Sequence, residues 1–209
     1  MTHEQDDVWI ESRCTMNRLE EQMKFIVEVD KLKKIVRQTY LSDGSRKEND
    51  AEHSWHLALM CCILSEYSNE KIDVGKTMSM VLIHDLIEID AGDTFAYDAI
   101  ANQSKKEREQ KAANRIFKLL PEDQERNIRS LWEEFEEGIT PEAKFANTLD
   151  KIQPLLLNDA ADGGSWKEHG VHLSQVLKRN EKTHLGSEIL WEYAKNLIMD
   201  NVEKGHLQE

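Results

Sequence analysis

Cysteine, proline and glycine are all scarce in this sequence, with 3 Cys, 3 Pro and 9 Gly among 209 residues. Cys61 and Cys62 are neighbours and only Cys14 remains, so the cysteines provide no disulfide framework and indicate a reducing, cytoplasmic environment. The few prolines and glycines leave no stretch with the composition of a linker. We therefore predict a single domain over residues 1–209.

Long apolar runs and an excess of basic residues are also missing. No run approaches the ~18 apolar residues of a membrane span, and the acidic start of the chain lacks the features of an export signal. The formal net charge of -13 would repel nucleic acids and anionic membranes. We therefore expect neither partner, whereas a small anionic substrate is compatible with this charge if a metal and an arginine offset it locally.

A helical period of apolar residues dominates the chain, and strand patterns are weak. We predict an all-α bundle of about seven to nine helices. Capping signals occur at Asn17 with Glu20, at Asp73, at Ser104 with Glu107, and at Thr140 before Pro141, while Gly92 and Gly138 mark helix ends. The predicted helices cover about 17–30, from 50, 73–92, from 104, 121–138, from 141, 171–179 and 187–202.

The single domain divides into an N-terminal extension (1–16), a core that bears the motifs (17–160) and C-terminal helices (161–209). Pro154 lies inside the helix predicted from residue 141, where its ring would crowd the carbonyl oxygen of Asp150. We therefore expect a kink just beyond Asp150.

Histidine and aspartate occur on three of the predicted helices. His53 lies early in one helix, His84 and Asp85 end a second, and Asp150 lies in a third. Two imidazoles with two carboxylates suit Mn, Fe, Co, Ni or Zn, whereas the cysteines lack the spacing of thiolate ligands. On these residues alone, a buried histidine oriented by its neighbouring aspartate is the simpler alternative.

Acidic residues gather between His84 and Asp93, directly after the apolar run 80–83. Glu88 lies four residues after His84 and hence on the same helix face, and Asp90 follows it. Charge of one sign beside an apolar run is costly unless it is compensated, and a bound cation is the simplest compensation. We therefore favour the metal site.

Three separated pieces of the sequence carry a resemblance to a known family. They are Glu52-His53-Ser54, then His84-Asp85-Leu86-Ile87-Glu88 with Gly92-Asp93, then Leu149-Asp150-Lys151. Together they resemble the signature of HD-domain phosphohydrolases, especially the 5'-deoxynucleotidase-like subgroup, over about residues 19–160. The resemblance implies an HD-domain fold and one buried divalent metal ion (Mn, Co, Fe, Ni, Zn or Mg), with His53, His84, Asp85 and Asp150 as ligands.

The resemblance also implies roles for further residues. Glu88 and Asp93 would be catalytic, with Glu88 positioning or deprotonating the attacking water and Asp93 contacting sugar or water. Arg37 would grip the phosphate through its planar fork, although an ordinary surface arginine is the alternative. Gln38, Asp93 and Thr94 would also contact the substrate. Because Gln38 stands where bacterial deoxynucleotidases carry tryptophan, selectivity for deoxyribose stays open.

The implied function is hydrolysis of a (deoxy)nucleoside 5'-monophosphate by a homodimeric, metal-dependent 5'-nucleotidase. One alternative is another HD phosphohydrolase, acting on a deoxynucleoside triphosphate, a cyclic dinucleotide or an alarmone. A second alternative is a non-catalytic module in which the metal only joins helices. The remaining candidates His56, His169, His172 and His184 are interpreted as surface or supporting residues.

Overall fold

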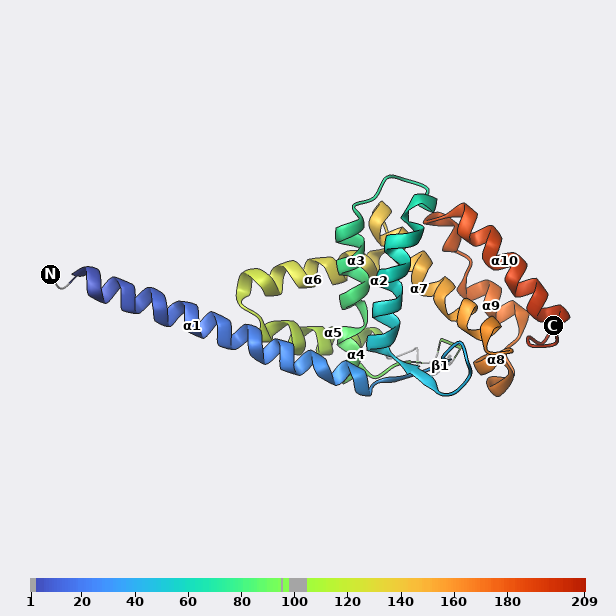
Figure 1. Ribbon diagram of the computed structural model, residues 1–209, viewed down its shortest axis with the longest axis horizontal. Coiled ribbons are helices and arrows are strands. Elements are labelled where there is room, and N and C mark those ends of the chain that lie inside the picture. The colour runs from blue at the N-terminus through green and yellow to red at the C-terminus, as the bar shows by residue number, and fades with distance from the viewer. Residues whose placement is uncertain (1–2, 95, 98–104) are drawn as a thin grey trace.

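Helices make up nearly all regular structure in the computed structural model, which describes residues 3–94, 96–97 and 105–209, with side chains from residue 15 onward (Figure 1). The α-helices are α1 (His3–Val29), α2 (Asp50–Leu64), α3 (Val74–Ile83), α4 (Glu88–Ala91), α5 (Lys105–Ile116), α6 (Glu122–Glu137), α7 (Pro141–Ala160), α8 (Gly164–His169), α9 (Leu173–Arg179) and α10 (Glu188–Glu203). Within these described ranges nine helices have six or more residues. The predicted all-α fold is therefore confirmed.

A short antiparallel hairpin between α1 and α2 was not predicted. It pairs β1 (Val36–Tyr40) with β2 (Lys47–Asn49). The side chains that the strands bury are Arg37, Thr39 and Glu48. A search for alternating apolar residues cannot find such a strand, because its inward positions are polar and charged.

Most sequence signals at helix ends are confirmed. The Thr140 side chain accepts a hydrogen bond from the amide of Ala143, with Pro141 in the first turn of α7. Gly138 ends α6 with a φ of 62°, a left-handed conformation that glycine adopts without steric cost. A side-chain cap contributes roughly 1 kcal/mol, so these signals help to fix where α7 begins.

The start of α1 was predicted wrongly. The helix begins at His3, so Asn17 and Glu20 lie inside it and do not cap it. Because α1 runs through residue 16, no element ends at the predicted limit of the N-terminal extension, and the division of the domain stays a prediction. The capping role of Ser104 lies outside the described residues.

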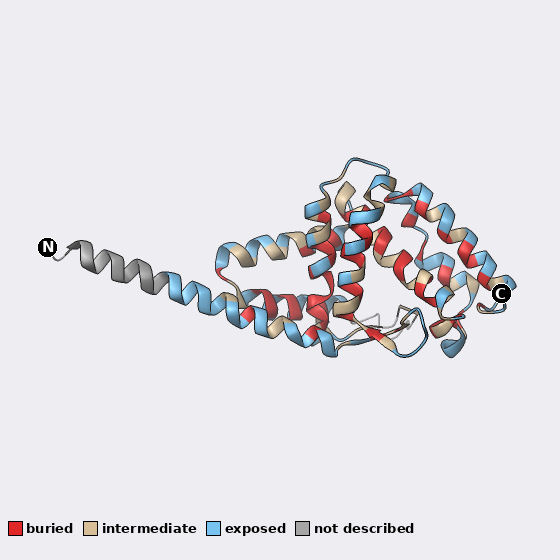
Figure 2. Ribbon diagram, in the orientation of Figure 1, coloured by how far each residue is buried: buried red, intermediate tan, exposed pale blue. Residues whose placement is uncertain are grey.

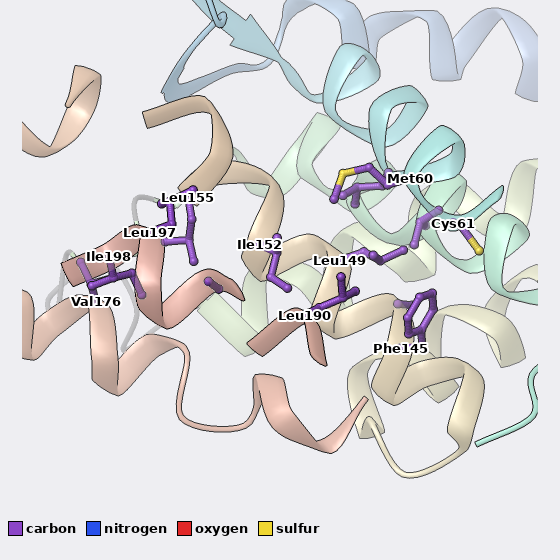
Figure 3. Packing of buried hydrophobic residues seen from close by; sticks show 14 of the residues in the cluster. Met60, Cys61, Phe145, Leu149, Ile152, Leu155, Val176, Leu190, Leu197 and Ile198 are labelled. Atoms are coloured by element: carbon purple, nitrogen blue, oxygen red, sulfur yellow. The ribbon is translucent and has the colours of Figure 1, made fainter. Parts of the chain in front are cut away.

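The main core lies around α7, which packs against α2, α3 and α10. Phe145, Leu149, Ile152 and Leu155 recur at three- and four-residue spacing and form the buried face of α7 (Figure 3). Burial of each such side chain contributes roughly 1.5–3 kcal/mol. The packing of this face fixes the position of Asp150, which lies next to it in the sequence.

α1 is long and projects beyond the rest of the protein (Figure 1), and residues 15–29 of it are largely exposed (Figure 2). Phe25 packs inward, but the predicted apolar face of this helix, Leu19, Met23, Ile26 and Val27, is exposed to solvent. None of the helices that the structure describes combines the length and apolarity needed to cross a membrane.

Candidate metal centre and active site

The four predicted metal ligands meet in space, although they come from three separate segments. His53 lies on α2, Asp150 on α7, and His84 and Asp85 on the turn after α3. The rings of His53 and His84 lie 5.5 Å apart between centroids, and their Nε2 atoms lie 3.1 and 3.7 Å from Oδ1 of Asp150. Asp85 closes the group, with Oδ1 3.1 Å from Nε2 of His84.

The chain changes helix type where the second histidine occurs. α3 ends at Ile83, residues His84–Ile87 form a 3₁₀ turn, and α4 then continues to Gly92. The prediction of one uninterrupted helix up to Gly92 was therefore wrong. A 3₁₀ turn has three residues per turn, so side chains three apart come onto one side. Asp85 and Glu88, which are three apart, thus come onto one side, and both are buried, as is His84.

Both histidines are held in the tautomer that suits a metal ligand. Nδ1 of His84 lies 2.9 Å from the carbonyl oxygen of Val81, and Nδ1 of His53 lies 3.1 Å from Oε1 of Gln153. Each Nδ1 therefore donates a hydrogen bond, which leaves Nε2 of each ring as the atom that would bind a metal. The buried Nε2 of His84 has no hydrogen-bond partner among the described residues. Ligand atoms of His53, His84 and Asp150 all lie within 4.8 Å of one another, which fits a cation.

The negative charge of this cluster is also best balanced by a bound cation. Burial, and then the charge of Arg37, lower the pKa of His53 to about 4, so this ring is neutral. Burial also lowers the pKa of His84, but the carboxylates of Asp85 and Asp150 outweigh it and raise the pKa to about 10. Without metal, a proton on His84 thus supplies the positive charge that the carboxylates require. A divalent ion can replace that proton.

A group of carboxylates that includes Asp85 lies beside the histidines. Oxygens of Asp50, Asp85 and Glu88 lie within 4.8 Å of one another, and all three residues are buried. Burial and the charges of Asp85 and Asp50 raise the pKa of Glu88 to about 11. The structure therefore places Glu88 next to the predicted ligand Asp85, and its catalytic role stays a prediction. Sequence reasoning missed Asp50, although it lies three residues before His53 on the same helix.

Arg37 lies among these carboxylates rather than on the surface, so the surface alternative was wrong. Its exposed fraction is 9%. Its Nη1 lies 3.0 Å from Oδ2 of Asp85 and 3.4 Å from Oδ1 of Asp50, and its Nε lies 3.4 Å from Oε1 of Glu48. Arg37 therefore offsets buried negative charge, and its contact with a substrate phosphate stays a prediction.

A cavity of about 60 Å³ is connected to the cluster through Arg37, which lines the cavity and contacts Asp85. Its wall includes all four predicted substrate-binding residues, Arg37, Gln38, Asp93 and Thr94. Lys151 and Arg179, which sequence reasoning missed, line it as well. Burial lowers the pKa of Lys151, and the positive charge of nearby Arg179 acts in the same direction. The described wall thus carries three cations and one carboxylate, and it favours an anion.

A larger cavity of about 570 Å³ lies between α5 and α6. Glu109, Glu133, Glu136 and Glu137 line it, together with Lys105 and Lys106. Four carboxylates against two ammonium groups disfavour a phosphate, so its size does not make it the better substrate site.

Comparison with known proteins agrees with this geometry. A family model described as an HD domain matches residues 29–191. The chain belongs to the HD-domain family. This HD-domain protein is 50% identical to a predicted metal-dependent phosphohydrolase from Magnetospirillum magnetotacticum MS-1, whose crystal structure matches with a TM-score of 0.88 over 92% of this chain and 96% of that one.

Two curated relatives carry the name of an enzyme. The HD-domain protein is 30% identical over 135 residues to 5'-deoxynucleotidase HDDC2 of Homo sapiens, covering 64% of this chain and 65% of the human protein. It is 30% identical over 140 residues to the protein of the same name from Dictyostelium discoideum, covering 64% of this chain and 74% of that protein. The match thus spans slightly less than two thirds of the human protein.

Proposed function

We propose that this HD-domain protein is a metal-dependent phosphohydrolase that releases phosphate from (deoxy)nucleoside 5'-monophosphates. The observation that carries the proposal is the position of Arg37. It lies 3.0 Å from Asp85, in the cluster with His53, His84 and Asp150, and it also lines a cavity together with Lys151 and Arg179. A site for a cation thus adjoins a site for an anion. The relatives named 5'-deoxynucleotidase support a nucleotide as the substrate.

His53, His84, Asp85 and Asp150 would hold one divalent metal ion, which when bound polarises phosphate oxygens and favours ionisation of water. Lys151 and Arg179 would bind the phosphate and offset its charge. Once the metal offsets the neighbouring carboxylates and Glu88 is ionised, Glu88 would accept a proton from the attacking water, whose oxygen bonds to phosphorus while the bond to the 5'-oxygen breaks. The nucleoside then leaves with a proton on that oxygen, and phosphate remains.

The cavity is large enough for the phosphate but not for a whole nucleotide. Its volume of about 60 Å³ is a few times the ~10–15 Å³ that one water needs on the same kind of scale. We infer that the phosphate occupies this cavity and that the sugar lies toward Gln38, Asp93 and Thr94. Gln38 would then face the sugar hydroxyls.

The deciding experiment is phosphate release from a panel of ribo- and deoxyribonucleoside 5'-monophosphates, with each candidate metal and with a chelator. Metal-dependent release from monophosphates supports the proposal. Release only from a triphosphate, a cyclic dinucleotide or an alarmone would assign a different HD phosphohydrolase. Binding of metal without release from any compound would instead show a module that uses the metal only structurally.

We also propose that the protein acts as a homodimer in the cytoplasm, with a small nucleotide as its partner. Exposed Met16, Leu19, Met23 and Ile26 on α1 support the dimer, because their spacing of three, four and three residues is that of a helix seam. Sedimentation of Met23→Glu should then show more monomer than that of Met199→Glu, which changes an exposed methionine on α10. Equal dimer content in both variants would remove α1 from the interface.

A further inference from the structure

Gln153 lies on α7, almost one turn after Asp150, and its side chain is fully buried. A buried carboxamide is destabilising unless its oxygen and its nitrogen both have partners. Its Oε1 lies 3.1 Å from Nδ1 of His53, and its Nε2 lies 2.9 Å from Oε2 of Glu48 and 3.3 Å from Nδ1 of His56. The protein thus provides a partner for each polar atom of this side chain.

These partners determine which way the carboxamide points. The carboxylate of Glu48 accepts hydrogen bonds, and so does the lone pair on Nδ1 of His56, so both face the amide nitrogen of Gln153. The carboxamide oxygen is left for His53, whose Nδ1 must donate. With Nδ1 donating to Gln153, Nε2 of His53 is the atom left for a metal ion, 3.1 Å from Oδ1 of Asp150.

The two histidines reach the same tautomer by different means. His84 donates to the main-chain carbonyl of Val81, which no side-chain substitution removes. His53 depends on the side chain of Gln153 instead. A substitution of Gln153 can therefore release one ring while the other keeps its partner.

Polar contacts continue from Gln153 to a second proposed ligand. Oε1 of Glu48 lies 3.4 Å from Nε of Arg37, and Nη1 of Arg37 lies 3.0 Å from Oδ2 of Asp85. We propose that Gln153 is a positioning residue, which orients His53 directly, and Asp85 through Glu48 and Arg37, for one divalent cation. This inference rests on the proposed metal ligands. Groups that orient metal ligands typically change metal affinity by about 10- to 100-fold when they are removed.

Gln153→Met keeps the size of the side chain and removes its hydrogen bonds. In the full-length protein the dissociation constant for Co²⁺, measured by titration of the visible absorption, should rise about 10- to 100-fold. The Co²⁺ spectrum should change as well, because one imidazole loses its fixed orientation. Unchanged affinity and an unchanged spectrum would overturn the inference.

A double variant and a control separate positioning from general destabilisation. Glu48→Gln combined with Gln153→Glu reverses the pair but keeps an oxygen acceptor for Nδ1 of His53, so Co²⁺ affinity should recover to within a few-fold of the unaltered protein. Asn201→Leu removes another fully buried amide, on α10, and should leave Co²⁺ affinity unchanged. Failure of the reversed pair to bind better than Gln153→Met would contradict the inference.

The tautomer of His53 can also be measured directly, in the protein loaded with the diamagnetic ion Zn²⁺. Long-range ¹H–¹⁵N spectra should show Nδ1 protonated and Nε2 unprotonated for His53 in the unaltered protein, and a loss of that preference in Gln153→Met. The opposite tautomer, or the same spectrum in both proteins, would overturn the role of Gln153. Absence of Co²⁺ binding by the unaltered protein would instead contradict the proposed function.

Discussion

The histidine and carboxylate cluster and the cavity beside it leave charge of opposite sign to be balanced. Around the cluster, Asp50, Asp85 and Asp150 are offset within the chain mainly by Arg37 and by a proton on His84. In the described wall of the cavity, Lys151 and Arg179 face a single carboxylate, Asp93, and Arg37 is shared with the cluster. The first region is therefore suited to a cation and the second to an anion.

Apart from Arg37, which both regions share, this difference teaches that the two regions can be altered separately. A protein with a net charge of -13 gathers Lys151, Arg179 and Arg37 here, close to a buried group of carboxylates. Substitutions in the cluster should abolish metal binding, whereas substitutions in the cavity should weaken only the substrate. Any variant that changes both equally would show that the regions form one site.

Loss of a metal ligand should have the largest effect. His84→Ala removes one imidazole from the cluster, so the purified protein should lose its metal, and phosphate release should fall on the order of 10³-fold or more, because the metal contributes several kcal/mol to the transition state. Metal analysis and the phosphate assay measure both. His184→Ala, an exposed histidine, is the control. A metal content in His84→Ala equal to that of the control would remove His84 from the ligands.

Glu88→Gln should have the second-largest effect on activity. The substitution keeps the shape of the side chain and removes its ability to take a proton, so kcat should fall about 10²- to 10⁴-fold while the metal stays bound. Glu109→Gln changes a buried acid in the larger cavity and should retain activity. Ordinary turnover by Glu88→Gln would assign the base elsewhere.

Loss of a cation from the cavity should have a moderate effect. Lys151→Met and Arg179→Met each remove one charged partner of the phosphate, worth roughly 1.5–3 kcal/mol, so KM should rise about 10- to 100-fold. Metal affinity should stay the same, which would sharpen the division between the two regions. Lys182→Met, an exposed neighbour, serves as the control. Wild-type KM in both cavity variants would mean that the phosphate binds elsewhere.

The pH dependence of stability should show the smallest effect. Because the folded-state pKa of His84 is raised to about 10, its stabilising effect is complete below the ordinary value of ~6.5 and is lost as pH rises toward 10. The raised pKa of Glu88 likewise stabilises the folded protein at low pH, and this stabilisation is lost as pH rises. The metal-bound protein needs no proton there, so the gain in Tm on adding Mn²⁺ should be larger at pH 8.5 than at pH 6.5, by about 2–4 °C per kcal/mol. Equal gains in Tm at the two pH values would contradict the replacement of the His84 proton by the metal.

Part of the site was predictable from helix periodicity, and part was not. Asp50 lies three residues before His53 and Gln153 three residues after Asp150, so each shares a helix face with a predicted ligand. Their omission was avoidable. Arg179, in contrast, lies far along the chain on α9, and only tertiary packing brings it to the cavity. Nothing in its local sequence indicates this position.

The fold shows the same limit. Periodicity located most of the helices, although it missed α8, but it did not decide which face of each helix packs inward. α2 carries Trp55, Leu59 and Ile63 on an exposed face, while Leu57 and Cys61 are buried. When both faces of a helix carry apolar side chains, the sequence predicts the helix but not its rotation relative to the core.

Pro154 continues α7 rather than ending it, and the predicted kink stays a prediction. Proline has no amide hydrogen, so residue 154 cannot donate to the carbonyl oxygen of Asp150, as a residue at that place in a helix normally would. The carbonyl oxygen of Asp150 therefore lacks its usual helical donor, and it lies one turn before Pro154, which lines the cavity. A carbonyl oxygen that lacks its helical donor can accept a hydrogen bond from a hydroxyl group instead.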